Sequence, residues 1–403
     1  MFLDVTRRRN PLLIEAAVDL HRAGRIPSNC YVIDIDTVAA NARTVSTAAN
    51  AHGLVSYQMT KQFGRNPLVA QAVARNGIER VVAVEFEEAR LLHSRGLLIG
   101  HLGHLTQVPV GEMRLALEMQ PQFITVFGLE QAEQLSRAAV ELGVEQSVLL
   151  RVHRDGDTYY AAQRGGVPTE RIVEVASHVQ DLPGIEVAGV TSFPCVLFNE
   201  GTGAFELTSN VATMSDALGR LRDAGLDVSV LNAPSASSSA TVGMLADAGA
   251  THVEPGSCLT GQTPLHAVSD EPEVPAMIYV SEVTHDLGDT VFTLGGGFYP
   301  RSRAAKALIF GRGSHHPVEA RVELDPPEAI DYYGNLRVDA SDRRAVHVGD
   351  TVVYAFRAQV FVSRCFVAVI EGADSTPSVV GVFDRGGFEL GGDLLPAAVG
   401  SRS

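Results

Sequence analysis

The sequence has no long apolar run, no paired cysteines and no excess of positive charge, and each absence disfavours one class of protein. No stretch of about 18 apolar residues occurs, so the sequence predicts no membrane-spanning helix. The four cysteines are far apart and form no CxxC pair, which argues against a disulfide framework and against a thiolate zinc site. The net charge of −15 repels nucleic acids and anionic membranes, so we expect neither as a partner.

The beginning of the chain does not have the order of a secretory signal. Arg7, Arg8 and Arg9 follow a short apolar run instead of preceding a long one. Together with the unpaired cysteines, this pattern predicts a protein of the reducing cytoplasm.

Length and periodicity predict a barrel with a large addition. The chain has 403 residues, and a (β/α)8 barrel takes about 250 of them. From about residue 30 to 255, short β-branched runs alternate with amphipathic helical patterns such as Leu129–Leu142, Arg171–Gln180 and Val211–Ala224, which is typical of βα units around a parallel sheet. An eight-stranded barrel fits these runs better than a doubly wound open sheet, which remains the alternative. The nine strand candidates, the first of which can lie outside the ring, are Tyr31–Ile35, Ser56–Thr60, Arg80–Val84, Leu98–Leu102, Phe123–Val126, Ser147–Val152, Glu186–Thr191, Val228–Leu231 and His252–Glu254.

After about residue 276 the pattern changes to strands without convincing helices, separated by Gly, Pro and Asp. We therefore predict an N-terminal helical segment over residues 1–29, with its helix over Asn10–Ala23, a barrel over residues 30–275 and a C-terminal β-domain over residues 276–403. The strand-like runs of the β-domain are Ala276–Glu282, Thr290–Leu294, Val318–Glu323, Asp350–Arg357, Val360–Val369 and Val379–Phe383.

Lys61 is the first candidate for chemistry. It follows the second strand candidate, and the active sites of α/β barrels collect at the carboxyl ends of the strands. A partly desolvated lysine loses its charge more readily and can then attack a carbonyl group. From its position alone, however, a solvated lysine at a strand end is the simpler interpretation.

Two polar loops follow the last two barrel strand candidates. Glu254-Pro255-Gly256-Ser257 combines a carboxylate with backbone N–H groups and a hydroxyl that suit a phosphate. Asn232–Ser239 opens a helix and contains four serines. Taken separately, the first is an ordinary turn and the second a polar helix cap. Taken with Lys61, they supply what pyridoxal 5′-phosphate (PLP) needs, namely a Schiff-base lysine, a phosphate cup and a partner for the pyridine nitrogen.

The order and spacing of these motifs over about 220 residues resemble alanine racemase and its PLP-dependent fold-type III relatives. The string Met59–Pro67 and the Asn232–Ser235 run are similar to the YhfX-like branch of this group. The resemblance implies a PLP-binding barrel with a C-terminal all-β domain. It rests on Ile33-Asp34-Ile35-Asp36, Lys61, Thr191-Ser192-Phe193-Pro194, the serine-rich loop and Glu254-Pro255-Gly256.

The resemblance also assigns roles to single residues. Lys61 would carry PLP as a Schiff base, and Glu254 would face the pyridine nitrogen. His104 or Gln107, in a segment similar to one in small PLP-carrier proteins, would face the ring, although a buried polar pair at a strand end fits them equally. Arg164 would bind a substrate carboxylate, although a surface salt bridge fits it as well. The remaining cofactor contacts would come from Ser192, Ser235, Ser237, Gly256 and Ser257.

The chain also departs from the known members of the group. Alanine racemase has an arginine where this chain has Glu254, and a carboxylate there makes the ring a stronger electron sink, as in the ornithine and diaminopimelate decarboxylase arm of the fold. Those decarboxylases have an arginine where this chain has Ser257, so the likeness is partial. Arg357-Ala358-Gln359 occupies the place of the His-x-Cys metal pair in the D-serine dehydratase and D-threonine aldolase arm, so we expect no metal.

Racemisation needs a second acid–base group on the face of the ring opposite the lysine. In this fold that group comes from the other subunit, so the resemblance implies a homodimer with shared active sites. Gly295-Gly296-Gly297-Phe298-Tyr299 is the best candidate segment, because its glycines permit close approach and Tyr299 could deliver a proton. A glycine hairpin with a core tyrosine is the alternative.

The leading hypothesis is a PLP-dependent amino-acid racemase or epimerase, which removes and returns the Cα proton. One alternative is a PLP-dependent lyase, either a decarboxylase or a D-amino-acid aldolase or dehydratase, suggested by Glu254. The other is a non-catalytic PLP carrier, suggested by the His101–Gln107 strand but disfavoured by the β-domain, because such carriers are barrels alone. The sequence does not predict which amino acid is the substrate.

Overall fold

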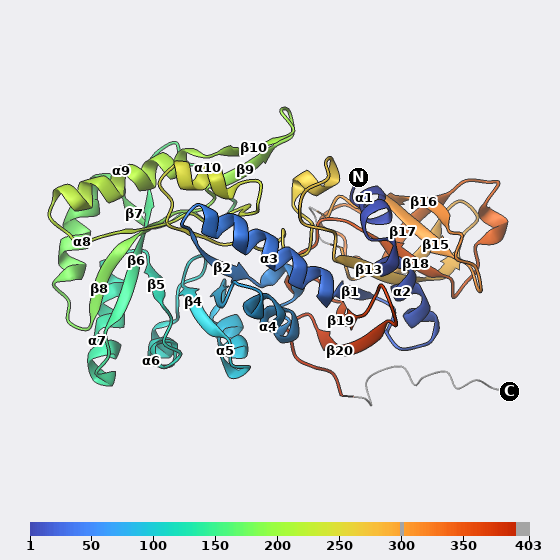
Figure 1. The fold of residues 1–403 in the computed structure, drawn as a ribbon, viewed down its shortest axis with the longest axis horizontal. Coiled ribbons are helices and arrows are strands. Elements are labelled where there is room, and N and C mark those ends of the chain that lie inside the picture. The colour runs from blue at the N-terminus through green and yellow to red at the C-terminus, as the bar shows by residue number, and fades with distance from the viewer. Residues whose placement is uncertain (299–301, 392–403) are drawn as a thin grey trace. The chain divides into compact units, whose positions relative to one another are not determined.

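The computed structural model describes residues 1–298 and 302–391, and contacts between its residues divide the chain into two compact units (Figure 1). The barrel unit contains Ala42–Thr60 and Val73–Cys258. The β-unit contains Met1–Asn41, Lys61–Ala72 and the chain from Leu259 onward. We describe each unit by itself.

Eight parallel strands of the barrel unit close into a ring. Their order is β5-β4-β3-β2-β12-β11-β8-β6, and β6 pairs again with β5. The structure thus confirms the predicted α/β barrel, with eight of the nine predicted runs forming the ring. The strands are β2 (Val55–Met59), β3 (Arg80–Ala83), β4 (Leu98–Leu102), β5 (Phe123–Val126), β6 (Gln146–His153), β8 (Ile185–Thr191), β11 (Val230–Asn232) and β12 (His252–Val253).

Helices follow the strands and lie on the outside of the ring (Figure 1). Helix α7 has the predicted bounds, and it ends where Gly143 takes the left-handed conformation that a side chain would disfavour. The helices are α3 (Ile35–Ala51), α4 (Pro67–Arg75), α5 (Phe86–Ser94), α6 (Met113–Glu118), α7 (Leu129–Leu142), α8 (Ile172–Gln180), α9 (Ser209–Asp223) and α10 (Val242–Asp247). Short strands β7 (Val167–Pro168), β9 (Val196–Asn199) and β10 (Ala204–Leu207) lie in the loops.

The inside of the ring is packed, and two glycines make room for its contents. Tyr57 and Phe123 are among the buried residues of this core. A Cβ atom on Gly100 would lie 2.4 Å from the Tyr57 ring, and one on Gly189 would lie 1.9 Å from the carbonyl oxygen of Val230. Both distances are far below van der Waals contact, so the ring requires glycine at these two positions.

The β-unit is built on a nine-stranded sheet that closes on itself in part. Strands β13, β14, β17, β16, β15 and β18 form an antiparallel ring, because β13 pairs with both β14 and β18, and β1, β19 and β20 extend the sheet from β13. The strands are β1 (Cys30–Asp34), β13 (Met277–Asp286), β14 (Val291–Leu294), β15 (Lys306–Phe310), β16 (Val318–Glu323), β17 (Tyr333–Val338), β18 (Thr351–Tyr354), β19 (Phe366–Glu371) and β20 (Ser378–Asp384).

The β-unit differs from the sequence prediction in four strands, β1, β15, β17 and β19. The predicted boundary at residue 30 assigns β1 to the barrel, whereas β1 pairs with β13 and β19 of the β-unit. Its apolar run fits either sheet, and its partners are more than 240 residues away in the chain, so local pattern could not distinguish them. Strands β15 and β17 were not predicted, and the predicted strand Val360–Val369 is divided into a 3-10 turn, η6 (Val360–Val362), and β19.

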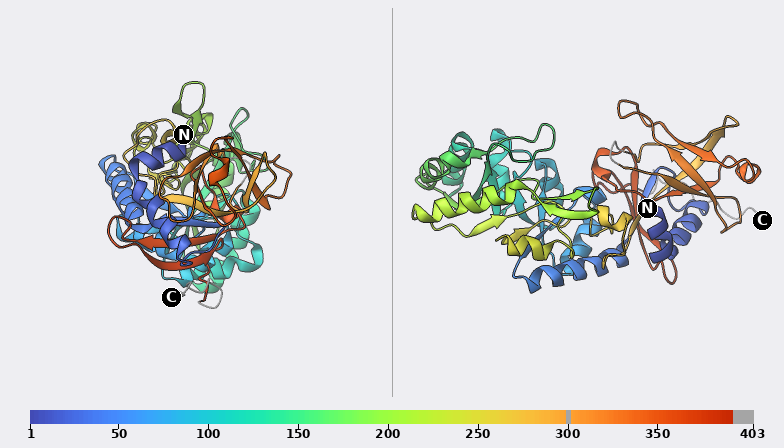
Figure 2. Two further views of the ribbon diagram at one scale, coloured as in Figure 1. Left: turned by 90° about the vertical axis from the view of Figure 1, so that its right-hand side faces the viewer. Right: turned by 90° about the horizontal axis from the view of Figure 1, so that it is seen from above.

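The N-terminal helices α1 (Phe2–Arg9) and α2 (Pro11–Arg22) pack on the β-unit (Figure 2). Asn10 caps α2 by accepting a hydrogen bond from the backbone N–H of Leu13, and Pro11 suits the first helical position. Leu13 and other apolar residues of α2 join the core formed by Ile278 and Val353. The sequence predicted this helix but left open which domain it covers.

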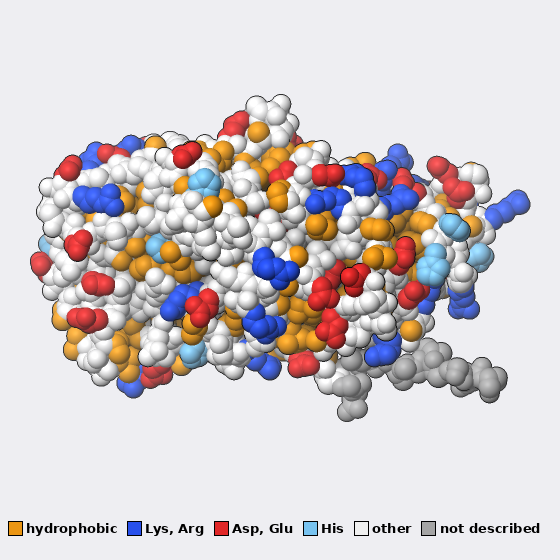
Figure 3. All heavy atoms as spheres, in the orientation of Figure 1, with side chains coloured by type: hydrophobic (Ala, Val, Ile, Leu, Met, Phe, Trp, Pro, Cys, Tyr) orange, Lys and Arg blue, Asp and Glu red, His pale blue; other side chains and the backbone are white. Residues whose placement is uncertain are grey.

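Among residues 1–298 and 302–391, no helix has the length and apolar character needed to cross a bilayer. On the face shown in Figure 3, acidic and basic side chains are interspersed instead of gathered by sign.

The packing of the ring predicts opposite effects for two glycine-to-alanine substitutions. Gly189→Ala should lower the free energy of unfolding by about 3 kcal/mol or more, because its methyl group would overlap the Val230 carbonyl. Gly219→Ala, in α9 with no atom within 4 Å of the added methyl, should raise it by about 0.5–1 kcal/mol through helix propensity. Urea denaturation measures both, and equal effects of the two substitutions would contradict the packing.

Candidate active site

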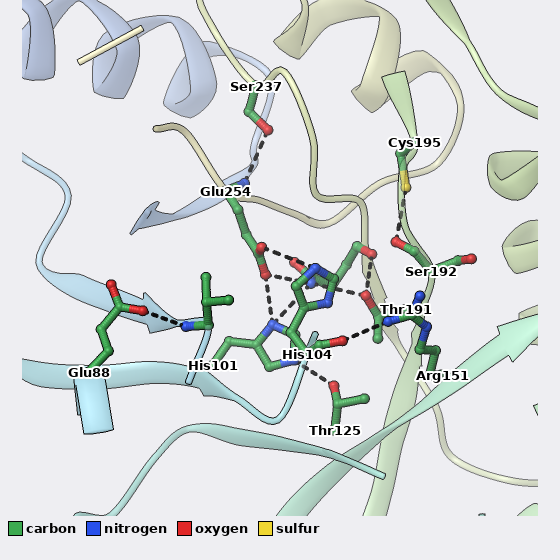
Figure 4. Close-up of polar contacts among 12 residues, drawn as sticks. Glu88, His101, His104, Thr125, Arg151, Thr191, Ser192, Cys195, Ser237 and Glu254 are labelled. Atoms are coloured by element: carbon green, nitrogen blue, oxygen red, sulfur yellow. Dashed lines mark hydrogen bonds and ion pairs between the residues drawn. The ribbon is translucent and has the colours of Figure 1, made fainter. Parts of the chain in front are cut away.

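A buried carboxylate lies at the carboxyl end of the barrel. Glu254 directly follows β12, and the polar side chains around it come from four other strands, with His101 on β4, Thr125 on β5, Thr191 on β8 and Asn232 on β11 (Figure 4). All five residues are buried. Closure of the ring therefore brings together groups that are up to 153 residues apart in the chain.

The two oxygens of Glu254 have different surroundings. Oε1 accepts hydrogen bonds from His101 Nδ1 at 2.7 Å and from Asn232 Nδ2 at 2.9 Å. Oε2 accepts no hydrogen bond from the residues that the structure describes, and it lies 3.9 Å from His104 Nε2. Because a buried acceptor without a donor is costly, Oε2 marks a place where a ligand can donate a hydrogen bond.

Glu254 is an anion despite its burial. Burial alone would raise its pKa, because the charged form loses its hydration, but the charge of His104 and the hydrogen bond and charge of His101 outweigh burial. The pKa of Glu254 is thereby lowered to about 2. A carboxylate in this state can keep a ring nitrogen protonated at neutral pH.

His101 connects Glu254 to Thr125. The Nε2 atom of His101 lies 2.5 Å from Thr125 Oγ1, while Nδ1 faces Glu254. An N–H group on Nδ1 points at the carboxylate, and Nε2 pairs with the threonine hydroxyl, so both ring nitrogens are hydrogen-bonded. Thr125 and His101 therefore fix the orientation of Glu254.

The serine-rich loop after β11 has a strained backbone. Ser235 and Ala236 both have positive φ, at 100° and 49°. Positive φ is costly at residues other than glycine, and such strain clusters at functional sites. The Ser237 hydroxyl accepts a hydrogen bond from the Glu254 backbone N–H at 3.2 Å, which fixes the loop to the carboxylate segment. The Ser235 hydroxyl donates to the Val196 carbonyl at 2.6 Å, so its side chain supports the loop.

Arg151 is a buried arginine at the barrel site that the sequence did not single out, and it is a further candidate site residue. It lies on β6, is 1% exposed, and donates to the carbonyl oxygens of His104 and Gln163 at 2.9 and 2.6 Å. Its guanidinium group lies 4.9 Å from the centre of the Phe127 ring, and no carboxylate of the described residues forms an ion pair with it. Burial lowers the pKa of Arg151. A buried cation with three N–H groups beyond those two bonds suits a ligand anion.

The predicted substrate arginine has a different environment. The side chain of Arg164 is 68% exposed and lies 3.6 Å from the exposed Asp155, which is the surface salt bridge that the sequence left as its alternative. A charged residue inside the apolar run Val148–Val152 was the sequence signal that could have drawn attention to Arg151.

The other predicted residues are placed as follows. Ser192 is buried, and its hydroxyl accepts a hydrogen bond from Asn210 Nδ2 at 3.1 Å. Gly256 and Ser257 continue the segment that contains Glu254. Tyr299 lies outside the described residues.

Lys61 begins a 3-10 turn, η1 (Lys61–Phe63), and a single residue separates it from the end of β2. Thr60, between them, donates a hydrogen bond to the buried carboxylate of Glu88, which also accepts from the Val84 backbone N–H at 2.7 Å. The end of β2 is thus fixed within the barrel unit, whereas Lys61 belongs to the β-unit.

The barrel residues fit the PLP ring and phosphate. Glu254 offers an anionic acceptor for the ring nitrogen, and the serine-rich loop offers backbone and hydroxyl donors for the phosphate.

His101, His104 and Glu254 are also the only group of the described residues spaced like metal ligands, with their ligand atoms within 4.8 Å of one another. The hydrogen bond of 2.7 Å between His101 and Glu254 is shorter than the separation of about 3.3 Å between two ligands of a tetrahedral zinc ion, so the arrangement fits hydrogen bonding better.

The lowered pKa of Glu254 predicts a pH dependence of stability. The folded protein keeps this carboxylate ionised down to about pH 2, whereas the unfolded chain protonates it near pH 4.5. Its contribution is fully present above pH 4.5 and is lost as the pH falls toward 2. Between pH 4.5 and 3, the free energy of unfolding of the wild type should fall more steeply than that of Glu254→Gln, by up to about 1.4 kcal/mol per pH unit. Urea denaturation tests this, and parallel curves would contradict the lowered pKa.

Two protein-family models match most of the chain. Residues 33–264 match the family model of the alanine racemase N-terminal domain, and residues 278–380 match that of the YhfX-like C-terminal domain. The chain is 38% identical over 392 residues to the uncharacterized protein YhfX of Escherichia coli (strain K12), which covers 97% of this chain and 100% of that protein.

Solved structures share the fold at low sequence identity. D-threonine aldolase from Filomicrobium marinum has a TM-score of 0.70 and 16% identity, over 90% of this chain and 96% of that one. Alanine racemase of Clostridium difficile 630 has a TM-score of 0.63 and 16% identity, over 89% and 99%. D-threo-3-hydroxyaspartate dehydratase from Delftia sp. HT23 has a TM-score of 0.64 and 15% identity, over 90% and 98%. The chain belongs to the alanine-racemase-like family of PLP-dependent proteins, in its YhfX-like branch.

Proposed function

We propose that the protein is a PLP-dependent amino-acid racemase or epimerase. The observation that carries the proposal is the buried Glu254 anion, whose Oε1 is held by His101 and Asn232 while Oε2 is open to a ligand. Bound PLP supplies an electron sink for negative charge that develops at the Cα atom of an amino acid. Glu254 strengthens that sink by holding the ring nitrogen in its protonated form.

The remaining roles belong to residues of this chain. Lys61 would carry the cofactor through its Nζ atom and, once released, would take or return the proton at Cα. The loop around Ser237, with Gly256 and Ser257, would bind the phosphate through backbone N–H groups. Tyr299 of a second copy remains the proposed acid on the opposite face, and a homodimer remains the proposed assembly.

Arg151 supports an amino acid as the substrate class. A guanidinium group buried without a carboxylate is stabilised when an anion reaches it. We assign to Arg151, in place of Arg164, the binding of the substrate carboxylate, which orients the Cα–H bond. The carbonyl oxygens of His104 and Gln163 hold the guanidinium plane in one position for this task.

A lyase is the second candidate, and Glu254 is the observation that favours it. A protonated ring nitrogen supports the breaking of any bond at Cα, including the bond to a carboxylate or to a side chain. D-threonine aldolase and D-threo-3-hydroxyaspartate dehydratase also share the fold. Release of glycine, ammonia or carbon dioxide distinguishes this function from racemisation.

Two measurements test the proposed function in sequence. The wild type should take up PLP, and borohydride should fix the cofactor to the peptide that contains Lys61, as detected by mass spectrometry, whereas Lys61→Ala should not become labelled. Candidate amino acids should then exchange their Cα proton in deuterated water and lose optical rotation. A protein that takes up no PLP would refute the proposal, and release of glycine, ammonia or carbon dioxide without loss of rotation would identify a lyase.

Arg151 and Arg164 form a matched pair for the substrate site. Arg151→Lys keeps the positive charge but loses the fork of donors, so KM for the substrate found above should rise about tenfold or more. Arg164→Lys should leave KM within about twofold, because this side chain is exposed. Steady-state kinetics gives both KM values. A rise in KM for Arg164→Lys alone would favour Arg164 as the carboxylate-binding residue, as the sequence predicted.

A further inference from the structure

The segment that begins with Lys61 belongs by its contacts to the β-unit, although barrel strands precede and follow it in the sequence. Strands β2 and β3 both belong to the barrel ring, yet Lys61–Ala72 between them belongs to the β-unit. Phe63 is fully buried, and the guanidinium group of Arg65 lies 5.5 Å from the centre of the Phe361 ring. The turn that presents Lys61 is therefore supported by residues near the other end of the chain.

Gly64 is the point of closest approach. A Cβ atom at this position would lie 2.8 Å from Val360 Cγ1, 3.2 Å from Val367 Cγ2 and 3.4 Å from the Arg385 carbonyl oxygen. Its φ of +71° is also in the left-handed region, where a side chain is disfavoured. Val360 and Val367 are fully buried, so neither can move aside without disturbing its own packing.

The surface beneath Gly64 is itself held in place. The hydroxyl of Ser363 donates to the Val360 carbonyl at 2.6 Å, and Arg385 Nη1 donates to the Ser363 carbonyl at 2.8 Å. Further along the segment, a Cβ atom on Gly381 of β20 would lie 3.4 Å from Leu68 Cδ1. The β-unit thus contacts the Lys61 segment at two places and fixes the 3-10 turn η6 on which Gly64 rests.

We propose that Gly64 and Val360 are positioning residues for Lys61. Through their contact, the β-unit sets the direction in which the lysine amine is presented, and so the rate at which it bonds to the PLP aldehyde. This inference rests on the proposed function, because it requires PLP to be the cofactor. It assigns noncovalent binding of the cofactor to Glu254 and the serine-rich loop, which the Gly64–Val360 contact does not include.

The test separates covalent attachment from noncovalent binding in the full-length apoprotein. Attachment is followed by mixing with PLP, stopping with borohydride at intervals and measuring the modified Lys61 peptide by mass spectrometry. Noncovalent binding is measured by calorimetry with pyridoxamine 5′-phosphate, which has the same ring and phosphate but no aldehyde. Gly64→Ala should slow attachment about tenfold or more, because small displacements of a reacting group are costly. Its affinity for pyridoxamine 5′-phosphate should stay within about twofold of wild type.

Gly53→Ala is the matched control. Gly53 has the same φ of +71°, lies before β2, and has no atom within 4 Å of an added Cβ. This substitution therefore measures left-handed strain without a clash, and attachment should keep the wild-type rate. The double substitution Gly64→Ala with Val360→Ala removes Cγ1 from the short contact and should restore much of the lost rate.

A second variant covers the case in which Gly64→Ala does not fold. Val360→Ile presses on the turn from the β-unit side and introduces no strain at Gly64, so it should slow attachment in the same way. The inference would be overturned if Gly64→Ala attached PLP at the wild-type rate. If that variant does not fold, the same result with Val360→Ile would overturn it. An equal loss of attachment and of pyridoxamine 5′-phosphate binding would overturn it too. If the wild type binds neither compound, the proposed function itself fails, which is a different result.

Discussion

The hydrogen bond from His101 to Glu254 is the interaction on which the candidate site depends. A carboxylate as buried as Glu254 would take up a proton unless donors and positive charge offset its loss of hydration. His101 and Asn232 supply the donors, and His104 supplies charge from 3.9 Å away. Because both donors act on Oε1, the second oxygen remains available, and the anion is prepared for a ligand instead of being neutralised by the protein.

The barrel makes this arrangement possible because it aims side chains from separate strands into one small volume. In the ring, β2 and β3 lie between β12, which precedes Glu254, and β4, which carries His101. Glycines at positions 100 and 189 let the strands and the Tyr57 ring approach closely below the site. The same closure brings the loop of Ser237 against the backbone of Glu254. A hydrogen bond between them therefore joins the proposed phosphate loop to the proposed ring contact.

The two units have different tasks in the proposed enzyme. The barrel unit carries Glu254, Arg151 and the serine-rich loop, which would bind cofactor and substrate without covalent bonds. The β-unit supports the turn that begins with Lys61, although this turn lies between two barrel strands in the sequence. The proposed chemistry therefore depends on the β-unit, which contains Lys61 as well as the residues that support its turn.

Local pattern determined much of the fold. The eight barrel strands and α7 were predictable because their periodicity is fixed by burial within each segment, and Lys61 and Glu254 could be named because motifs of a known family surround them. Pairing over long distances decided the rest. The partners of β1 lie far along the chain, and only the closed ring shows that Arg151 is buried whereas Arg164 is exposed. The periodicity of a segment indicates whether a residue is buried. Only the tertiary structure determines in which core it is buried and which residues it contacts there.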